Sequence, residues 1–221
     1  AALVAGNNAF AFDLYRAIRA GEGNLLYSPF SISQALAMVY VGARNQTAQQ
    51  MADTLHFTLA QERLHPAFNA LDLELRSRSR ASVRVTSGAQ KGEVAFELNV
   101  ANAAWGQEGY HFLAEYLDVL AQNYGSGVRL VDFKAAAAAA NAINRWVSEK
   151  TAGRIREIVR DSDLSQGTPL VLANAIYFNA MWDLPFDKAS TYDEPFHLLE
   201  GREERVPMMH QRNRFRYTGG E

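Results

Sequence analysis

Almost every residue from Leu170 to Ala180 is apolar, and Asn174 stands inside the run. A strand this apolar is stable when both of its faces are covered, as at the centre of a sheet, although a buried helix segment can have the same composition. The run therefore predicts a fold in which other elements pack against both sides of this segment.

Apolar and polar residues alternate from Val94 to Val100, so we expect a strand from Glu93 to about Trp105 with one buried face. Apolar runs bounded by turn residues predict shorter strands elsewhere. These are expected at Asn24 to Tyr27, Val128 to Phe133, Tyr192 to Leu199 and Arg205 to His210, with a turn at Gly201 between the last two.

The first third of the chain has the spacing of helices. One helix is expected to follow an N-cap at Asn7 or Asn8, and another to begin at Ser28 and Pro29, a capping hydroxyl and a first-turn proline. Thr47 has the form of a capping-box residue because Gln50 follows it by three. Further helices are expected around Leu64 to Leu75, Leu113 to Tyr124 and Ala135 to Lys150.

Helices that alternate unevenly with long strands, without a repeat or an evident linker, predict an α+β fold built round a large sheet. We expect residues 1–221 to form a single domain.

Composition and motifs exclude several functions. The chain has no cysteine and a net charge of -2, so it has no thiolate site and no global field that attracts nucleic acid or membrane. Its five histidines are scattered, and neither a metal-ligand spacing nor a nucleophile or phosphate-loop motif occurs. We expect no enzyme activity, no catalytic residue, no cofactor, no metal, and no nucleic-acid or membrane partner.

The main basic concentration is Arg76, Arg78 and Arg80, followed by Arg84. These residues would bind a sulfated polysaccharide if they shared one face. They are equally explained as cations at a helix C-terminus, where they are favourable. Asn45 begins a glycosylation sequon, and we favour the capping role for its threonine, Thr47.

Several segments resemble the serpin family in order along the chain. The specific ones are NLLYSPFSIS at 24–33 and NAIYFNAMW at 174–182, joined by LNVANAAW at 98–105 and VPMM at 206–209. The resemblance runs from Phe10 to about Tyr217. It implies the N-terminal portion of a serpin-like domain, with the reactive centre loop and further strands beyond Glu221.

The resemblance implies inhibition of serine proteases, or of cysteine proteases, by a covalent suicide-substrate mechanism. The protease cleaves an exposed loop, which then inserts into the large sheet beside the strand at 170–180. A helix at 135–150 would cross that sheet. The alternative is a non-inhibitory serpin that acts as a carrier, chaperone or storage protein, or an inactive fragment.

The resemblance also suggests a monomeric full-length protein that acts outside the cell, although intracellular serpins leave that open. A chain of residues 1–221 by itself is expected to be unstable, because core faces and sheet edges would be uncovered.

Ser28, Ser31 and Asn174 match the serpin shutter, a hydrogen-bonded cluster beneath the sheet. A buried asparagine requires partners, and two hydroxyls at the start of a helix could supply them, although Ser28 could be only a cap. Trp182 matches the breach, where the inserting loop enters, and it could equally be an aromatic anchor at the strand end.

Overall fold

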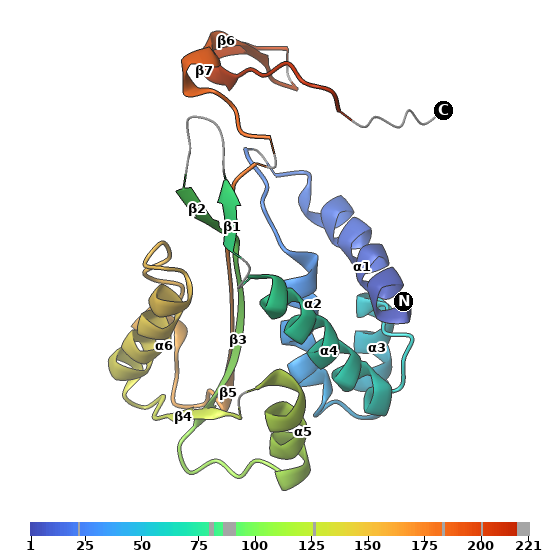
Figure 1. Cartoon of the computed structure of the whole chain (residues 1–221). Helices are drawn as coiled ribbons and strands as arrows, with labels where there is room; N and C mark the ends of the chain where they lie inside the picture. Colours follow the sequence, from blue (N-terminus) through green and yellow to red (C-terminus); the bar gives the residue numbers. More distant parts are fainter. Residues whose placement is uncertain are drawn as a thin grey trace. The chain divides into compact units, whose positions relative to one another are not determined.

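The computed structural model describes residues 1–21, 23–79, 82–85, 92–125, 127–182, 184–199 and 201–215. Figure 1 shows the helices and strands in their order along the chain. The chain divides into two compact units, one of residues 1–80 and 97–178 and the other of residues 81–96 and 179–221. No helix among the described residues is long and apolar enough to cross a membrane.

Four helices form one part of the first unit: α1 (Ala2–Ile18), α2 (Pro29–Tyr40), α3 (Asn45–Leu55) and α4 (Gln61–Ser79). They share a core around Phe68, which is fully buried. Ser28 caps α2 as the sequence predicts, because its Oγ accepts a hydrogen bond from the Ser31 N–H at 3.3 Å. Ser28 and Pro29 thereby fix where this buried helix begins.

Gly6 lies where α1 approaches the end of α3. A Cβ added there would collide with the carbonyl oxygen of His56, a backbone atom that cannot rotate away. We expect Gly6→Ala to lower the free energy of unfolding of the full-length protein by about 1–3 kcal/mol, measured by urea denaturation. Gly21→Ala is the matched control, since a Cβ at Gly21 meets its nearest atom at an ordinary 3.7 Å. Equal stability of the two variants would contradict this prediction.

A three-stranded sheet forms the rest of the first unit, with the strand order β4 (Arg129–Val131), β3 (Glu97–Gln107) and β5 (Leu170–Asn179). β4 runs parallel to β3 and pairs only with the last three residues of β3, Trp105 to Gln107. The rest of that edge of β3 therefore has no strand beside it among the described residues.

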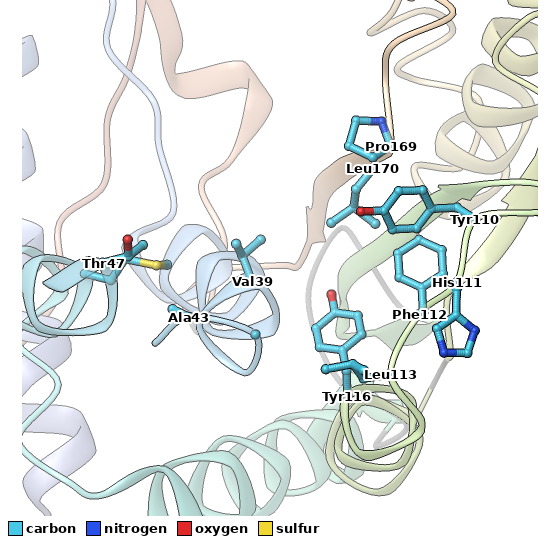
Figure 2. A pocket seen from close by; sticks show the side chains of 12 residues that line it. Val39, Ala43, Thr47, Tyr110, His111, Phe112, Leu113, Tyr116, Pro169 and Leu170 are labelled. Atoms are coloured by element: carbon cyan, nitrogen blue, oxygen red, sulfur yellow. The ribbon is translucent and has the colours of Figure 1, made fainter. Parts of the chain in front are cut away.

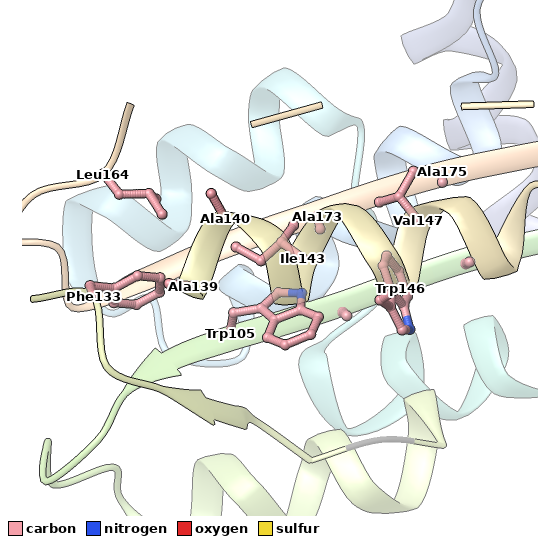
Figure 3. Close-up of a cluster of buried hydrophobic side chains, with 12 residues drawn as sticks. Trp105, Phe133, Ala139, Ala140, Ile143, Trp146, Val147, Leu164, Ala173 and Ala175 are labelled. Carbon is pink, nitrogen blue, oxygen red and sulfur yellow. The ribbon is translucent and has the colours of Figure 1, made fainter. Parts of the chain in front are cut away.

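Both faces of the sheet are covered, as the sequence predicts. Helix α6 (Ala136–Lys150) packs on one face through Ile143 and Val147, which are fully buried (Figure 3). The sheet presents mostly small side chains to α6: Ala101 and Ala103 from β3, and Ala173 and Ala175 from β5. On the other face, Leu170 and Leu172 pack with residues of α2 and of α5 (Ala114–Tyr124).

The second unit contains two antiparallel pairs of strands. One is β1 (Ser82–Val85) with β2 (Gly92–Ala95), and the other is β6 (Thr191–His197) with β7 (Glu203–Met209). The second pair confirms the hairpin expected around Gly201, whose φ of 77° suits glycine. Two 3₁₀ turns, Asp161–Asp163 in the first unit and Lys188–Ser190 in the second, complete the described elements.

Three local predictions in the first unit are wrong: the start of the first helix, the strand at residues 24–27 and the start of the third helix. Helix α1 begins at Ala2, so Asn7 and Asn8 lie inside it, because burial of Leu3 and Gly6 continues the apolar face upstream of Phe10. Residues 24–27 are not a strand, since no neighbouring strand pairs with them among the described residues.

The predicted capping box at Thr47 is also wrong. Helix α3 begins at Asn45, with Arg44 as its N-cap and no side-chain cap, so Thr47 lies within the first turn. Arg44 instead donates to the carbonyl oxygens of Val41 and Ala43, at 2.7 and 2.9 Å, which anchors the connection from α2.

The strand expected from Glu93 to Trp105 is two strands. It is divided at Phe96, and β2 and β3 belong to different sheets. β5 is covered on both faces but is an outer strand of the three, whereas a central position was expected. The helices expected at Leu113 to Tyr124 and Ala135 to Lys150 are confirmed as α5 and α6.

Candidate functional site

The side chain of Asn174 joins β5 to α2 and to β3. Its Nδ2 lies within hydrogen-bond distance of three oxygens: the Ser31 carbonyl at 3.1 Å, the Ser31 Oγ at 2.5 Å and the Asn102 Oδ1 at 2.5 Å. Since a carboxamide has two N–H bonds, one of them is shared between the two Ser31 oxygens. Ser31 is fully buried, so these contacts lie beneath the sheet and not at the surface.

The structure thus places Ser31 and Asn174 in contact, whereas Ser28 lies at the helix cap. Ser28 Oγ caps α2 through the Ser31 N–H, and it supports the cluster by fixing the helix start that carries Ser31. Among the described contacts, Ser28 makes no hydrogen bond to Asn174.

Two members of the cluster were not identified from the sequence. Asn102 of β3 accepts from Asn174 and donates its Nδ2 to the Oε1 of Gln34 at 2.9 Å. Gln34 lies one turn after Ser31 on α2 and is 4% exposed. A signal existed for each, because both are polar residues inside otherwise apolar segments that must pack against the strand of Asn174.

Trp182 lies in the second unit, three residues after the last residue of β5. Its ring packs edge-on against Phe186 at 5.4 Å, and 62% of the residue is exposed. The chemistry of this position is that of an exposed aromatic surface near a strand end.

A histidine–tyrosine pair, His65 and Tyr124, links α4 to α5. His65 Nδ1 lies 2.6 Å from the Tyr124 hydroxyl, while Nε2 has no hydrogen-bond partner among the described residues. Burial lowers the pKa of His65 to about 4, and the negative charge of Glu62 opposes that shift. Burial also raises the pKa of the Tyr124 hydroxyl. The pair is therefore neutral at physiological pH.

Arg76 and Arg78, the two arginines of the basic concentration that the structure describes, each pair with an acidic residue one turn earlier on α4. Arg76 pairs with Asp72 at 2.6 Å, and Arg78 donates two hydrogen bonds to Glu74 Oε1 on the same helix. Arg80 lies outside the described residues, as does the side chain of Arg84.

An apolar cavity of about 470 Å³ opens in the first unit between α2, α3, α5 and the start of β5 (Figure 2). The rings of Tyr110, Phe112 and Tyr116 line it. The ring centroids of Tyr110 and Phe112 are 5.0 Å apart, and Phe112 is stacked on Tyr116 with their centroids 6.3 Å apart. Burial raises the pKa of the Tyr116 hydroxyl, so that group is a neutral hydrogen-bonding partner.

Among the residues described, no group of three or more histidine or carboxylate side chains could hold a metal ion. The cluster around Asn174 is built from neutral amides and a hydroxyl that connect β5, α2 and β3.

Comparison with known proteins supports the fold and extends over nearly the whole chain. The sequence model of the family described as "Serpin (serine protease inhibitor)" matches residues 5–221. The chain is 38% identical over 216 residues to a leukocyte elastase inhibitor of Sus scrofa, which covers 96% of this chain and 53% of that protein. It is also 40% identical over 211 residues to an uncharacterized serpin-like protein of Thermococcus kodakarensis. That match covers 95% of this chain and 46% of the other protein.

Solved structures agree. Emu ovalbumin superposes with a TM-score of 0.80 at 27% identity, over 96% of this chain and 55% of that one. The Manduca sexta serine protease inhibitor serpin-12 superposes with a TM-score of 0.78 at 27% identity, over 96% of this chain and 54% of that one. The chain thus spans about half the length of the relatives that it matches.

Proposed function

This chain belongs to the serpin family, and on that basis we propose that the full-length protein is a protease inhibitor and not an enzyme. The observation that carries the proposal is the likeness, at 38% identity in the pig protein, to relatives named leukocyte elastase inhibitor. A serine protease of the elastase kind is therefore the first target to examine, with cysteine proteases as the second class.

The proposed mechanism is covalent trapping. The protease would cleave a loop in a part of the protein beyond these residues, and the loop would insert beside β5 as a new strand. Insertion needs a strand edge that can accept a partner, and β5 is the outer strand of the three described here. Insertion as a release of stored strain is a recognised type of conformational switch.

Within this mechanism we assign the conformational switch, or shutter, to Ser28, Ser31 and Asn174, with Asn102 and Gln34 as additional members. The cluster connects β5 to the elements behind it, so its hydrogen bonds must adapt when β5 gains a new neighbour. Trp182 is proposed as the breach residue because it follows β5 and presents an exposed ring.

Partner, location and assembly remain proposals. We expect a monomer without a nucleic-acid or membrane partner. Action outside the cell is the family-based expectation, and the relatives named above give it no support. A polyanion contact at Arg76, Arg78 and Arg80 also stays a hypothesis, weakened at Arg78 by its pairing with Glu74.

The proposal predicts a covalent complex. Incubation of the full-length protein with leukocyte elastase is expected to give a band on denaturing gels at the summed mass, together with loss of protease activity. Protease whose nucleophilic serine is replaced by alanine is the control and should give no such band, because no acyl bond can form. Cleavage without any complex, for both serine and cysteine proteases, would favour the non-inhibitory alternative.

A further inference from the structure

The fold brings three cationic side chains from distant parts of the chain to one small cavity. Arg76 of α4, Arg129 of β4 and Lys150 at the end of α6 line a space of about 120 Å³. The cavity lies beside the portion of β3 that β4 does not pair, which is why side chains from three elements reach it. Its other lining residues are Asn99, Val100, Ala101, Asn102, Tyr124, Gly125 and Trp146.

The positive charge of this cavity is only partly neutralised. No acidic side chain is among the described residues that line it. Arg76 is paired with Asp72, whereas Arg129 and Lys150 have no ion pair with any residue that the structure describes. Two uncompensated cations and one compensated cation around a small space attract an anion.

Two of the three cationic groups, those of Arg76 and Arg129, are restrained by contacts with other side chains. The Arg129 guanidinium lies 5.5 Å from the centroid of the Trp105 ring, a cation–π contact. The Asp72 carboxylate restrains the Arg76 guanidinium at 2.6 Å. Asn99 donates to the backbone carbonyl of Lys150 at 2.8 Å, which fixes the end of α6 that carries this lysine. Groups that are already ordered lose less conformational entropy when a ligand binds.

Size and neighbouring charge favour a compact anion. A space of 120 Å³ exceeds the volume of roughly 30 Å³ that one water occupies, so it admits one tetrahedral oxyanion. The adjoining cavity shares Arg76 and Asn99 but is also lined by Glu97, whose carboxylate would repel an extended polyanion passing along α4.

From these contacts we propose that the cavity between α4, β4 and α6 binds the phosphate or sulfate group of a small ligand. Arg76 and Arg129 supply guanidinium groups, whose planar donors match such oxyanions, and Lys150 supplies a point charge. The inference does not depend on protease inhibition, because it concerns a separate group of residues and a binding measurement.

Calorimetric titration of the full-length protein with pyrophosphate at low ionic strength tests the proposal. We expect saturable binding at one site, and at least about tenfold weaker affinity in the double variant Arg129→Gln with Lys150→Gln, because charged hydrogen bonds are lost. The matched control is Arg145→Gln with Arg156→Gln, which removes the same charge from exposed positions outside the cavity. It should retain the wild-type affinity.

Additional measurements distinguish the kind of ligand and check that the variants are folded. The charge-preserving pair Arg129→Lys with Lys150→Arg should restore most of the affinity, and near-ultraviolet circular dichroism should match for all variants. A sulfated disaccharide tested beside pyrophosphate distinguishes a sulfate source from a phosphate source. Absence of saturable binding to either probe, or an equal loss in the cavity and control variants, would overturn the proposal. Binding only of long heparin, weakened by Arg78→Gln, would overturn it too.

Discussion

Asn174→Ala is expected to lower the free energy of unfolding of the full-length protein by about 2–3 kcal/mol. The substitution removes the donor that serves Ser31 and Asn102, and it leaves the Oδ1 of Asn102 without this partner in a partly buried place. Because the lost contacts join β5 to both α2 and β3, the proposed mechanism also predicts more of the latent or polymeric form. Urea denaturation and native gels after mild heating measure the two effects.

Asn141→Ala is a suitable control for this experiment. Asn141 is an exposed residue of α6, and alanine has the higher helix propensity, so the variant should be as stable as the wild type. An unchanged unfolding midpoint for Asn174→Ala, with no polymer, would remove the support for a conformational switch at this cluster.

Acidification is expected to destabilise the protein through His65. The folded state holds its pKa near 4, whereas the unfolded chain has the ordinary value of 6.5. Between these values the unfolded state binds more protons, so stability is retained above pH 6.5 and falls as the pH drops toward 4. Between pH 7.5 and pH 5 the loss is about 2 kcal/mol.

The surroundings of His65 explain the direction of this effect. The groups near the imidazole are Tyr124 of α5, Tyr40 of α2 with its ring at 6.3 Å, and Glu62 on the same helix. Only Glu62 carries a negative charge, and burial outweighs it. A protonated ring would also place a second N–H at Nε2, which has no partner among the described residues.

Urea midpoints of wild type and His65→Phe at pH 7.5 and pH 5 measure this contribution. The variant should be less stable at pH 7.5, because the Tyr124 hydroxyl loses its partner, and should lose less stability on acidification. His111→Gln replaces an exposed histidine and should show the wild-type dependence on pH. If His65→Phe shows the full wild-type dependence, the acid sensitivity arises elsewhere.

Sequence reasoning predicted well those elements whose signal is local. The Ser28 and Pro29 pair determines the start of α2, and the periodic apolar residues determine α5 and α6. It failed where a distant contact decides the outcome. Residues 24–27 have the composition of a strand but no strand partner among the described residues. The division at Phe96 is not visible in the alternation, which continues through it.

The candidate site was predicted in part for the same reason. Ser31 and Asn174 were found because a family resemblance and the cost of burying an amide pointed to the same residues. Asn102 and Gln34 were missed because nothing local relates them to a residue more than 70 positions away. The cationic cavity could not be predicted from the sequence. Its residues Arg76, Arg129 and Lys150 belong to three different elements and become neighbours only when these elements pack together.

The alanine-rich contact between α6 and the sheet has a kinetic consequence. Ala101, Ala103, Ala173 and Ala175 have no side-chain rotamers to interlock with the helix, whereas Trp105 of β3 meets Trp146 of α6 edge-on, with ring centroids 6.2 Å apart. Lifting α6 away exposes Ile143 and Val147 to water and is opposed, whereas displacement along the surface keeps them covered. We therefore expect the alanines to oppose sliding of α6 only weakly, and the edge-on contact of Trp105 with Trp146 to hold the helix in its position along the sheet.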